Sequence, residues 1–395
     1  MSEIHVSAAL PAGGVHPVRA TVGAVTTTIA CVLPVFLLGG LAVQMGAELR
    51  FSPAGLGLAV SVYFGGSAIA SVPSGALVER YGPAVIARGG ILLAAATLLA
   101  IGVFARSFAL LLVLLALSAV ANALGQLASN SVLARHVPVG RQGVSFGLKQ
   151  AAIPLSTLLA GIAVPTVALT VGWRWAFVAA AGAALTALPL VPNGHHGGGR
   201  TQGSGGERAT AALIVIGGAA LLASASAGSL GTFLVDSAVE RGLGPGLAGL
   251  ALTFGSTVCV AARVLGGHLA DRGIGGRVST IGAMLVVGSA GLALLAVGGT
   301  VPLVAGVVLG FGLGWAWPGL MNFAVVRLHP QAPAAATSIT QTGVYAGGCL
   351  GPLGLGPLAA YADYPAMWRV AAVAMLLAAA LMFAGGRMLH HRAAA

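Results

Sequence analysis

GALVERYG at residues 75–82 and GHLADRG at residues 267–273 are two copies of one short charged motif. Their glycine, acid and arginine stand 192 residues apart in a chain of 395 residues. That chain is 57% hydrophobic and only 7% charged. Because charged residues are so rare, their recurrence in register indicates a duplicated architecture.

The composition excludes an ordinary soluble protein. The mean hydropathy is +0.98, and a wetted surface needs several times the charge density that this chain carries. In lipid every backbone amide must find a partner within the protein, so only helices or closed barrels cross the membrane. The apolar runs are too long and uniform for alternating barrel strands. The sequence therefore predicts an all-α membrane protein.

The apolar runs predict twelve transmembrane helices in two pseudo-symmetric six-helix bundles. The first span, about residues 21–45, is too long for a signal-peptide core, so we expect it to be retained. Because each bundle has an even number of spans, both enter the membrane in the same direction. The spans are expected to begin near residues 21, 54, 83, 107, 143, 173, 210, 246, 276, 301, 333 and 366.

Further residues recur at nearly the same offset, which supports the duplication. Between the halves, residues 193–209 are rich in glycine and polar residues, as expected of a flexible cytoplasmic linker. We predict a cytoplasmic N-terminus at residues 1–20, an N-terminal six-helix bundle at 21–192, the cytoplasmic linker at 193–209, a C-terminal six-helix bundle at 210–387 and a cytoplasmic C-terminus at 388–395. The recurring pairs are Arg135 with Arg327, Gln150 with Gln341, and Trp173-Arg174 with Trp368-Arg369.

The formal charge of +11 is distributed as expected for a protein oriented in a membrane, and it does not indicate nucleic-acid binding. With both termini in the cytoplasm, twelve arginines fall inside and five outside, which satisfies the positive-inside rule. We therefore expect a multi-pass protein of the cytoplasmic membrane with both termini inside. The five arginines expected outside are Arg50, Arg106, Arg174, Arg241 and Arg369.

No cofactor or metal site is expected. Residues 197–200 are glycine-rich but lack the lysine and helix start of a phosphate-binding loop, and His195-His196 is typical of a solvated loop. The three cysteines fall in apolar spans, without disulfide or metal spacing. No catalytic constellation is visible within the spans, so an enzyme is not expected.

The chain resembles the major facilitator superfamily in two respects. It has six predicted spans on either side of a central loop, and a Gly-x-x-x-Asp/Glu-Arg motif follows the second span of each half. The resemblance covers essentially the whole chain. Residues 147–154 and 341–348 are also similar to an actinobacterial-type branch near the cyanate and nitroimidazole transporters. The superfamily resemblance implies a secondary transporter that works by alternating access.

The resemblance also implies that the charged motif is a gating latch. Gly75 would let helix backbones approach closely, the acids would face a helix N-terminus, and the arginines would bind carboxylates or carbonyls. The alternative is that these charges only fix topology. Ile274 stands where Gly82 stands in the first copy, which implies a looser closure. The gating candidates are Gly75, Glu79, Arg80, Gly82, Arg88, Gly267, Asp271 and Arg272.

Two cations lie inside predicted spans. Lys149 lies about six residues into the fifth span, and Arg263 about seven residues before the end of the eighth. Either side chain could serve a substrate or reach the cytoplasmic interface through its long stem. No acid lies in the middle of a span, and Asp236 at the edge of the seventh comes nearest. Embedded cations without embedded anions favour an anionic or polar substrate.

Polar stripes suggest further site residues. Their side chains could line a watery cavity, or they could join helices by hydrogen bonds. Trp315 and Trp317 lie too deep for an interfacial belt, so substrate stacking or packing is expected. The stripes comprise Asn122, Gln126 and Asn130 in the fourth span, Gln150 beside Lys149 in the fifth, and Ser338, Gln341, Thr342 and Tyr345 in the eleventh.

The primary hypothesis is a transporter of a small polar or anionic solute. The alternative is a proton-coupled drug or antibiotic efflux antiporter. Two features of that class are absent from their usual places: Ala121 replaces the arginine expected before Gly125, and the glycine-proline motif at residues 347–354 lies in the eleventh span rather than the fifth. The expected partners are a small-molecule substrate and the lipid bilayer, with no nucleic acid, and the expected state is a monomer.

Overall fold

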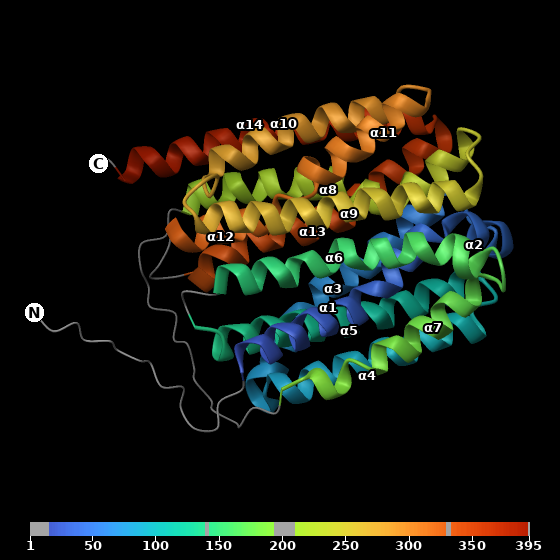
Figure 1. Ribbon diagram of the computed structural model, residues 1–395, viewed down its shortest axis with the longest axis horizontal. Helices are drawn as coiled ribbons and strands as arrows, with labels where there is room; N and C mark the ends of the chain where they lie inside the picture. The colour runs from blue at the N-terminus through green and yellow to red at the C-terminus, as the bar shows by residue number, and fades with distance from the viewer. Residues whose placement is uncertain (1–15, 139–141, 193–209, 329–332, 394–395) are drawn as a thin grey trace, which may run out of the picture.

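The computed structural model describes residues 16–138, 142–192, 210–328 and 333–393, and all regular structure within these ranges is helical (Figure 1). The predicted all-α fold is confirmed. The helices are α1 Pro17–Gly40, α2 Ala42–Leu49, α3 Pro53–Tyr81, α4 Pro83–Phe104, α5 Phe108–His136, α6 Gln142–Ala163, α7 Trp173–Leu185, α8 Thr210–Glu240, α9 Pro245–Asp271, α10 Val278–Leu295, α11 Thr300–Leu309, α12 Pro318–Leu328, α13 Pro333–Tyr361 and α14 Tyr364–Ala393, with short segments η2 Val164–Ala168, η3 Leu188–Leu190 and η4 Gly310–Gly314.

Local signals explain why the predicted starts lie close to the observed ones. Pro53, Pro83 and Pro245 each begin a helix, where the missing N–H has no partner to lose. Ser107 caps α5 by accepting a hydrogen bond from the backbone N–H of Leu110 at 3.3 Å. The first span differs from the prediction: α1 begins at Pro17 and ends at Gly40. The rest of the predicted span belongs to the short helix α2.

Eleven helical segments of the described residues are long and apolar enough to cross a membrane. The chain is therefore a multi-pass membrane protein. α13, predicted as the eleventh span, is a helix of 29 residues but is not among these eleven segments. Its many glycines and its polar first half lower its hydropathy. The total of twelve spans stays a prediction.

The helices pack in two groups that repeat one another. In the first group α1 packs on α6 and α4 on α7; in the second, α8 packs on α13 and α10 on α14. Figure 1 shows α4, α5 and α7 in the lower part of the view and α8, α10 and α14 in the upper part. The two groups meet where α3 packs on α13 and α6 packs on α9. We call this contact surface the seam.

The two ends of the bundle can be told apart by the charged motifs. We call the end at which α3 and α9 finish, near Gly82 and Arg272, the motif end. The other end, where α3 and α9 begin, is the opposite end. There the seam is closed by small residues. A side chain at Gly57 would meet the backbone of Pro352 and Gly356, and one at Gly161 would meet Gly249. Glycine is needed because the backbones approach so closely.

A hydrogen-bonded cluster fixes the first group at the opposite end. Glu48 accepts hydrogen bonds from Arg174 Nη2 at 2.5 Å and from the Trp173 indole at 2.6 Å. Arg174 also donates to the Ala105 carbonyl at 2.9 Å. Burial raises the pKa of Glu48, but these two hydrogen bonds and the positive charge outweigh it and lower that pKa below its ordinary 4.5. The cluster ties α2, α4 and α7 together.

The second group repeats part of this arrangement. The Trp368 indole, in the first turns of α14, donates to Ser237 Oγ of α8 at 2.9 Å. Arg241 donates to the Val297 carbonyl at the end of α10 at 3.1 Å, as Arg174 does at the end of α4. The tryptophans of the two recurring pairs therefore lie at similar helix junctions, whereas Arg369 donates to the Pro365 carbonyl of its own helix.

Candidate functional site

Arg263 joins the two groups of helices across the seam. Its side chain lies in α9 and is only 6% exposed. One Nη donates to the main-chain carbonyl of Gln150 in α6, and the other donates to the carbonyl of Trp315 at 2.7 Å. Arg263 therefore faces the protein interior. Its side chain does not extend to the cytoplasmic interface, which was one of the two alternatives for this residue.

Both carbonyls that Arg263 binds lie where the regular helical hydrogen-bond pattern is interrupted. In a regular helix the Gln150 carbonyl accepts from the residue four positions later, which is Pro154 and has no N–H. The Trp315 carbonyl lies in the interruption between η4 and α12, where regular helix resumes only at Pro318. An unpaired carbonyl in the membrane interior is costly, so the guanidinium satisfies two groups that proline and helix breakage leave free.

Lys149 is buried as well, within the first group. It is 4% exposed, and its ammonium donates to Gln126 Oε1 of α5 at 2.5 Å. The fourth-span stripe therefore contributes directly to the environment of this cation. Within the described residues neither Lys149 nor Arg263 has a carboxylate partner.

The rest of the fourth-span stripe divides between two surroundings. Asn122 is buried and its amide donates to Ser67 Oγ of α3 at 3.0 Å. Its carbonyl oxygen Oδ1 has no hydrogen-bond partner among the described residues. Asn130 is exposed. One residue of the stripe thus joins helices and one lies open, so the three do not act as a single polar face.

The aromatic and eleventh-span candidates lie near the same seam. Trp315 is buried and packs edge-on against Phe36 of α1 and Phe311, with ring centroids 6.1 and 5.5 Å away. Trp317 is also buried, and its indole N–H has no partner among the described residues. Gln341 and Tyr345 of α13 are half-buried. The side chain of Ser338 lies outside the described residues.

Sequence reasoning missed two polar contacts across the seam. Thr157 Oγ1 of α6 and Ser256 Oγ of α9 are 2.5 Å apart, and Ser61 Oγ of α3 donates to the Cys349 carbonyl of α13 at 2.7 Å. Serine and threonine are common in transmembrane helices, so nothing in their spacing marked these residues.

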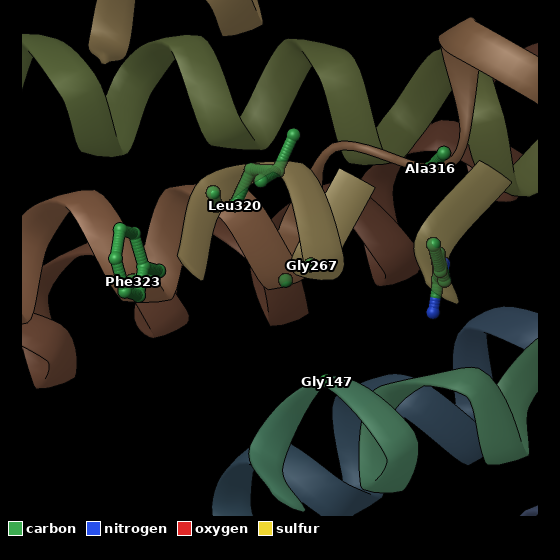
Figure 2. A pocket seen from close by; sticks show the side chains of 8 residues that line it. Gly147, Gly267, Ala316, Leu320 and Phe323 are labelled. Atoms are coloured by element: carbon green, nitrogen blue, oxygen red, sulfur yellow. The ribbon is translucent and has the colours of Figure 1, made fainter. Parts of the chain in front are cut away.

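A pocket opens between the groups on the motif side of Arg263. Figure 2 shows Gly147 of α6 across a gap from Gly267 of α9, with Leu320 and Phe323 of α12 on the side of Gly267. The pocket is partly open to solvent, and its enclosed volume is small, about 20 Å³, which is room for about one water molecule. Lys149 is not among its lining residues. These are Gly147, Arg263, Gly267, Ala270, Ala316, Gly319, Leu320 and Phe323.

The gating glycines differ from the expectation. A side chain at Gly75 or Gly267 would meet nothing within 4 Å, so neither position is a close backbone approach in this conformation. No described atom lies beside this face of α3, so the close approach predicted at Gly75 is not present among the described residues in this conformation. Gly82 does have a backbone requirement, since its φ of +85° favours glycine. In the second copy Gly273, with φ +80°, meets this need one position before Ile274.

The charged members of the motif have few described partners. Arg88 donates to the Val191 carbonyl at 3.4 Å, which ties α4 to the chain just before residue 193. Arg80 stacks over the Tyr81 ring at 5.3 Å, and Arg272 is exposed. The side chains of Glu79 and Asp271 lie outside the described residues, as does the segment 193–209 that contains His195-His196.

Comparison with known proteins settles the family. The family model described as Major Facilitator Superfamily matches residues 24–352 and, in a second overlapping match, residues 216–392. The chain belongs to the major facilitator superfamily. No curated protein matches it.

Membership fixes the general activity. Proteins of the major facilitator superfamily are secondary transporters and are generally not enzymes, so this chain is a membrane transporter. Among the described residues, no group of three or more histidine, cysteine or acidic side chains could hold a metal ion. All three cysteines are free; Cys31 and Cys259 are buried and Cys349 is half-buried.

Proposed function

We propose that this chain moves a small polar or anionic solute across the cytoplasmic membrane by alternating access. The observation that carries the proposal is the pair of buried cations, Lys149 and Arg263, which have no carboxylate partner within the described residues. A buried charge that lacks a counterion is expensive in the membrane. An anionic substrate would supply the missing charge to both.

The substrate route would follow the seam, with Lys149 and Gln126 on one side and Arg263 on the other. Asn122, Gln150, Trp315, Gln341 and Tyr345 complete the proposed site. The charged motifs would act as latches at the motif end, with the arginines binding carbonyls as Arg88 does. The proposed organisation is twelve spans, α13 included, in two bundles at residues 21–192 and 210–387. The protein would act as a monomer with its motif end and both termini in the cytoplasm.

A proton-coupled efflux antiporter of drugs or antibiotics is the second candidate. The largely apolar lining of the pocket favours it, because hydrophobic cargo would contact apolar side chains there. Cationic cargo needs an acid at the site, and the nearest described candidate is Asp236, which accepts a hydrogen bond from Tyr364 at the opposite end of α8. Asp236 lies near the opposite end of the bundle and is not among the lining residues of the pocket, so the observations favour the anionic substrate.

The test is transport by purified protein in proteoliposomes, after a thermal-shift screen of organic anions, metabolites and antibiotics has identified a ligand. Lys149→Gln should abolish transport of that ligand. Arg369→Gln removes an exposed cation that, among the described residues, hydrogen-bonds only within its own helix, and this variant should transport normally. Transport of cationic drugs that collapses with a proton uncoupler and is unaffected by Lys149→Gln would instead support the antiporter.

A further inference from the structure

The pocket beside Arg263 is lined by apolar residues except for this one cation among the described residues. Among the residues that the structure describes, eight line it: Arg263 is charged, and the other seven are glycine, alanine, leucine or phenylalanine. A single cation at the inner wall of an apolar hollow matches a ligand with one anionic group and an apolar body. A strongly hydrated small anion would leave the apolar wall without a partner.

The guanidinium of Arg263 has an N–H donor that makes no hydrogen bond to the described residues. Its two Nη groups bind neutral carbonyls, and its Nε has no hydrogen-bond partner among the described residues. The polar neighbour on its own helix is the thiol of Cys259, a weak hydrogen-bonding group. A carboxylate binds the planar fork of arginine through two parallel bonds, which are stronger than bonds to a neutral carbonyl.

We propose that this pocket is a binding subsite for an amphipathic organic anion, with a carboxylate head on Arg263 and an apolar body against Leu320 and Phe323. The proposal rests on the transport function proposed above and narrows its substrate class. The head replaces the Gln150 carbonyl as the partner of one Nη group, while the Trp315 carbonyl keeps the other.

Substrate binding then acts on the seam. Of the two hydrogen bonds that Arg263 makes with described carbonyls, the bond to Gln150 reaches the first group of helices, because Trp315 belongs to the second. When the carboxylate takes its place, α6 is released from α9 at this point. Head-group recognition is thereby coupled to the separation of the two groups.

The experiment measures binding of simple probes to the full-length protein in detergent, by thermal shift and isothermal titration calorimetry. Benzoate and cyclohexanecarboxylate carry both the head and the body. Acetate carries the head alone, benzyl alcohol the body alone, and benzylamine the body with the opposite charge. We expect the first two to bind and the other three to bind at least about tenfold more weakly, since each lacks one interaction.

Two variants locate the site. Arg263→Gln should weaken benzoate binding by about tenfold or more, because a charge-assisted pair is lost. Phe323→Ala should weaken benzoate but leave acetate unchanged, and it keeps the proposal testable should Arg263→Gln fail to fold. Arg369→Gln is the matched control and should bind benzoate like the native protein. Equal binding of benzyl alcohol and benzoate, or unchanged benzoate binding in Phe323→Ala, would overturn the proposal.

The result also separates this proposal from the broader function. Binding and transport of small hydrophilic anions, with no binding of benzoate or cyclohexanecarboxylate, would overturn the amphipathic subsite and leave the transport proposal standing. Failure of every anion in both assays would overturn both.

Discussion

Arg263 of α9 donates a hydrogen bond to the main-chain carbonyl of Gln150 in α6, 113 positions away in the sequence. The carbonyl is available because Pro154 cannot donate to it. The same guanidinium binds the Trp315 carbonyl at the interruption before α12. One buried cation therefore supplies hydrogen bonds to two carbonyl groups at irregular positions in different parts of the bundle.

This relationship predicts the effect of Pro154→Ala. The new N–H would give the Gln150 carbonyl a partner within α6, so the bridge from Arg263 should weaken. We expect the distance between spin labels at Gly147→Cys and Gly267→Cys, which face each other across the pocket, to lengthen or broaden in electron paramagnetic resonance. Pro73→Ala, which also changes a proline inside a helix, is the control and should leave the distribution unchanged. An unaltered distribution in Pro154→Ala would contradict the account.

The contact between Lys149 and Gln126 predicts a second effect. Gln126→Leu would leave a buried ammonium without its acceptor and should lower the free energy of unfolding by about 1–3 kcal/mol. Lys149→Met in the same background should recover most of the loss, since no charge then remains to satisfy. The measurement is a chemical-denaturation series in detergent. Asn130→Leu, at an exposed position of the same helix, should change stability little. Equal losses in both leucine variants would disprove the specific role of Gln126.

The Glu48 cluster predicts a dependence on pH. The pKa of Glu48 is lower in the folded protein than in the unfolded chain, so its contribution is present above the ordinary value of 4.5 and is lost as the pH falls through the lowered folded pKa. Because the pair is partly exposed, the contribution is only about 0.5–1 kcal/mol. Melting temperatures at pH 7, 5, 4 and 3 should fall less steeply below pH 5 in Glu48→Gln than in the native protein. Parallel curves for the two proteins would count against the cluster.

The closed opposite end of the seam depends on glycine. A side chain at Gly161 would collide with Gly249 and Thr253 of α9, so Gly161→Val should force α6 and α9 apart there. We expect stronger thiol labelling of Thr253→Cys, which adds no bulk at this contact, and loss of transport. Gly182→Val is the matched control, because that helical glycine of α7 has nothing within 4 Å. Unchanged labelling would show that the seam can accommodate a larger side chain at Gly161 without separating α6 from α9.

The first charged motif separates two roles of glycine. Gly75→Ala should be tolerated and can even stabilise α3 by up to about 1 kcal/mol, since alanine is the better helix former. Gly82→Ala should destabilise by about 1 kcal/mol or more, because the left-handed backbone at φ +85° disfavours any side chain. Thermal unfolding compares the two. A transport defect in Gly75→Ala with normal stability would show that this glycine is needed in another conformation.

Much of the fold could be predicted from the sequence, for local reasons. Long apolar runs must become helices in lipid, and proline and serine mark where several of them begin, as at Pro53 and Ser107. The limits of local reasoning are visible at Gly40, where α1 ends before the apolar run does, and at Gly75, whose motif suggested a neighbour that the packing does not place there.

The sequence by itself determined that this is a helical membrane protein with a repeated motif, and it selected Lys149 and Arg263 as unusual. Only the tertiary structure decided what those cations bind. Gln126 is 23 positions from Lys149, and Gln150 is 113 from Arg263, so neither pairing follows from helical periodicity. The physical reason is that hydrophobicity and caps act within one helix, whereas the partner of a buried charge depends on which helices pack together and where each one is interrupted.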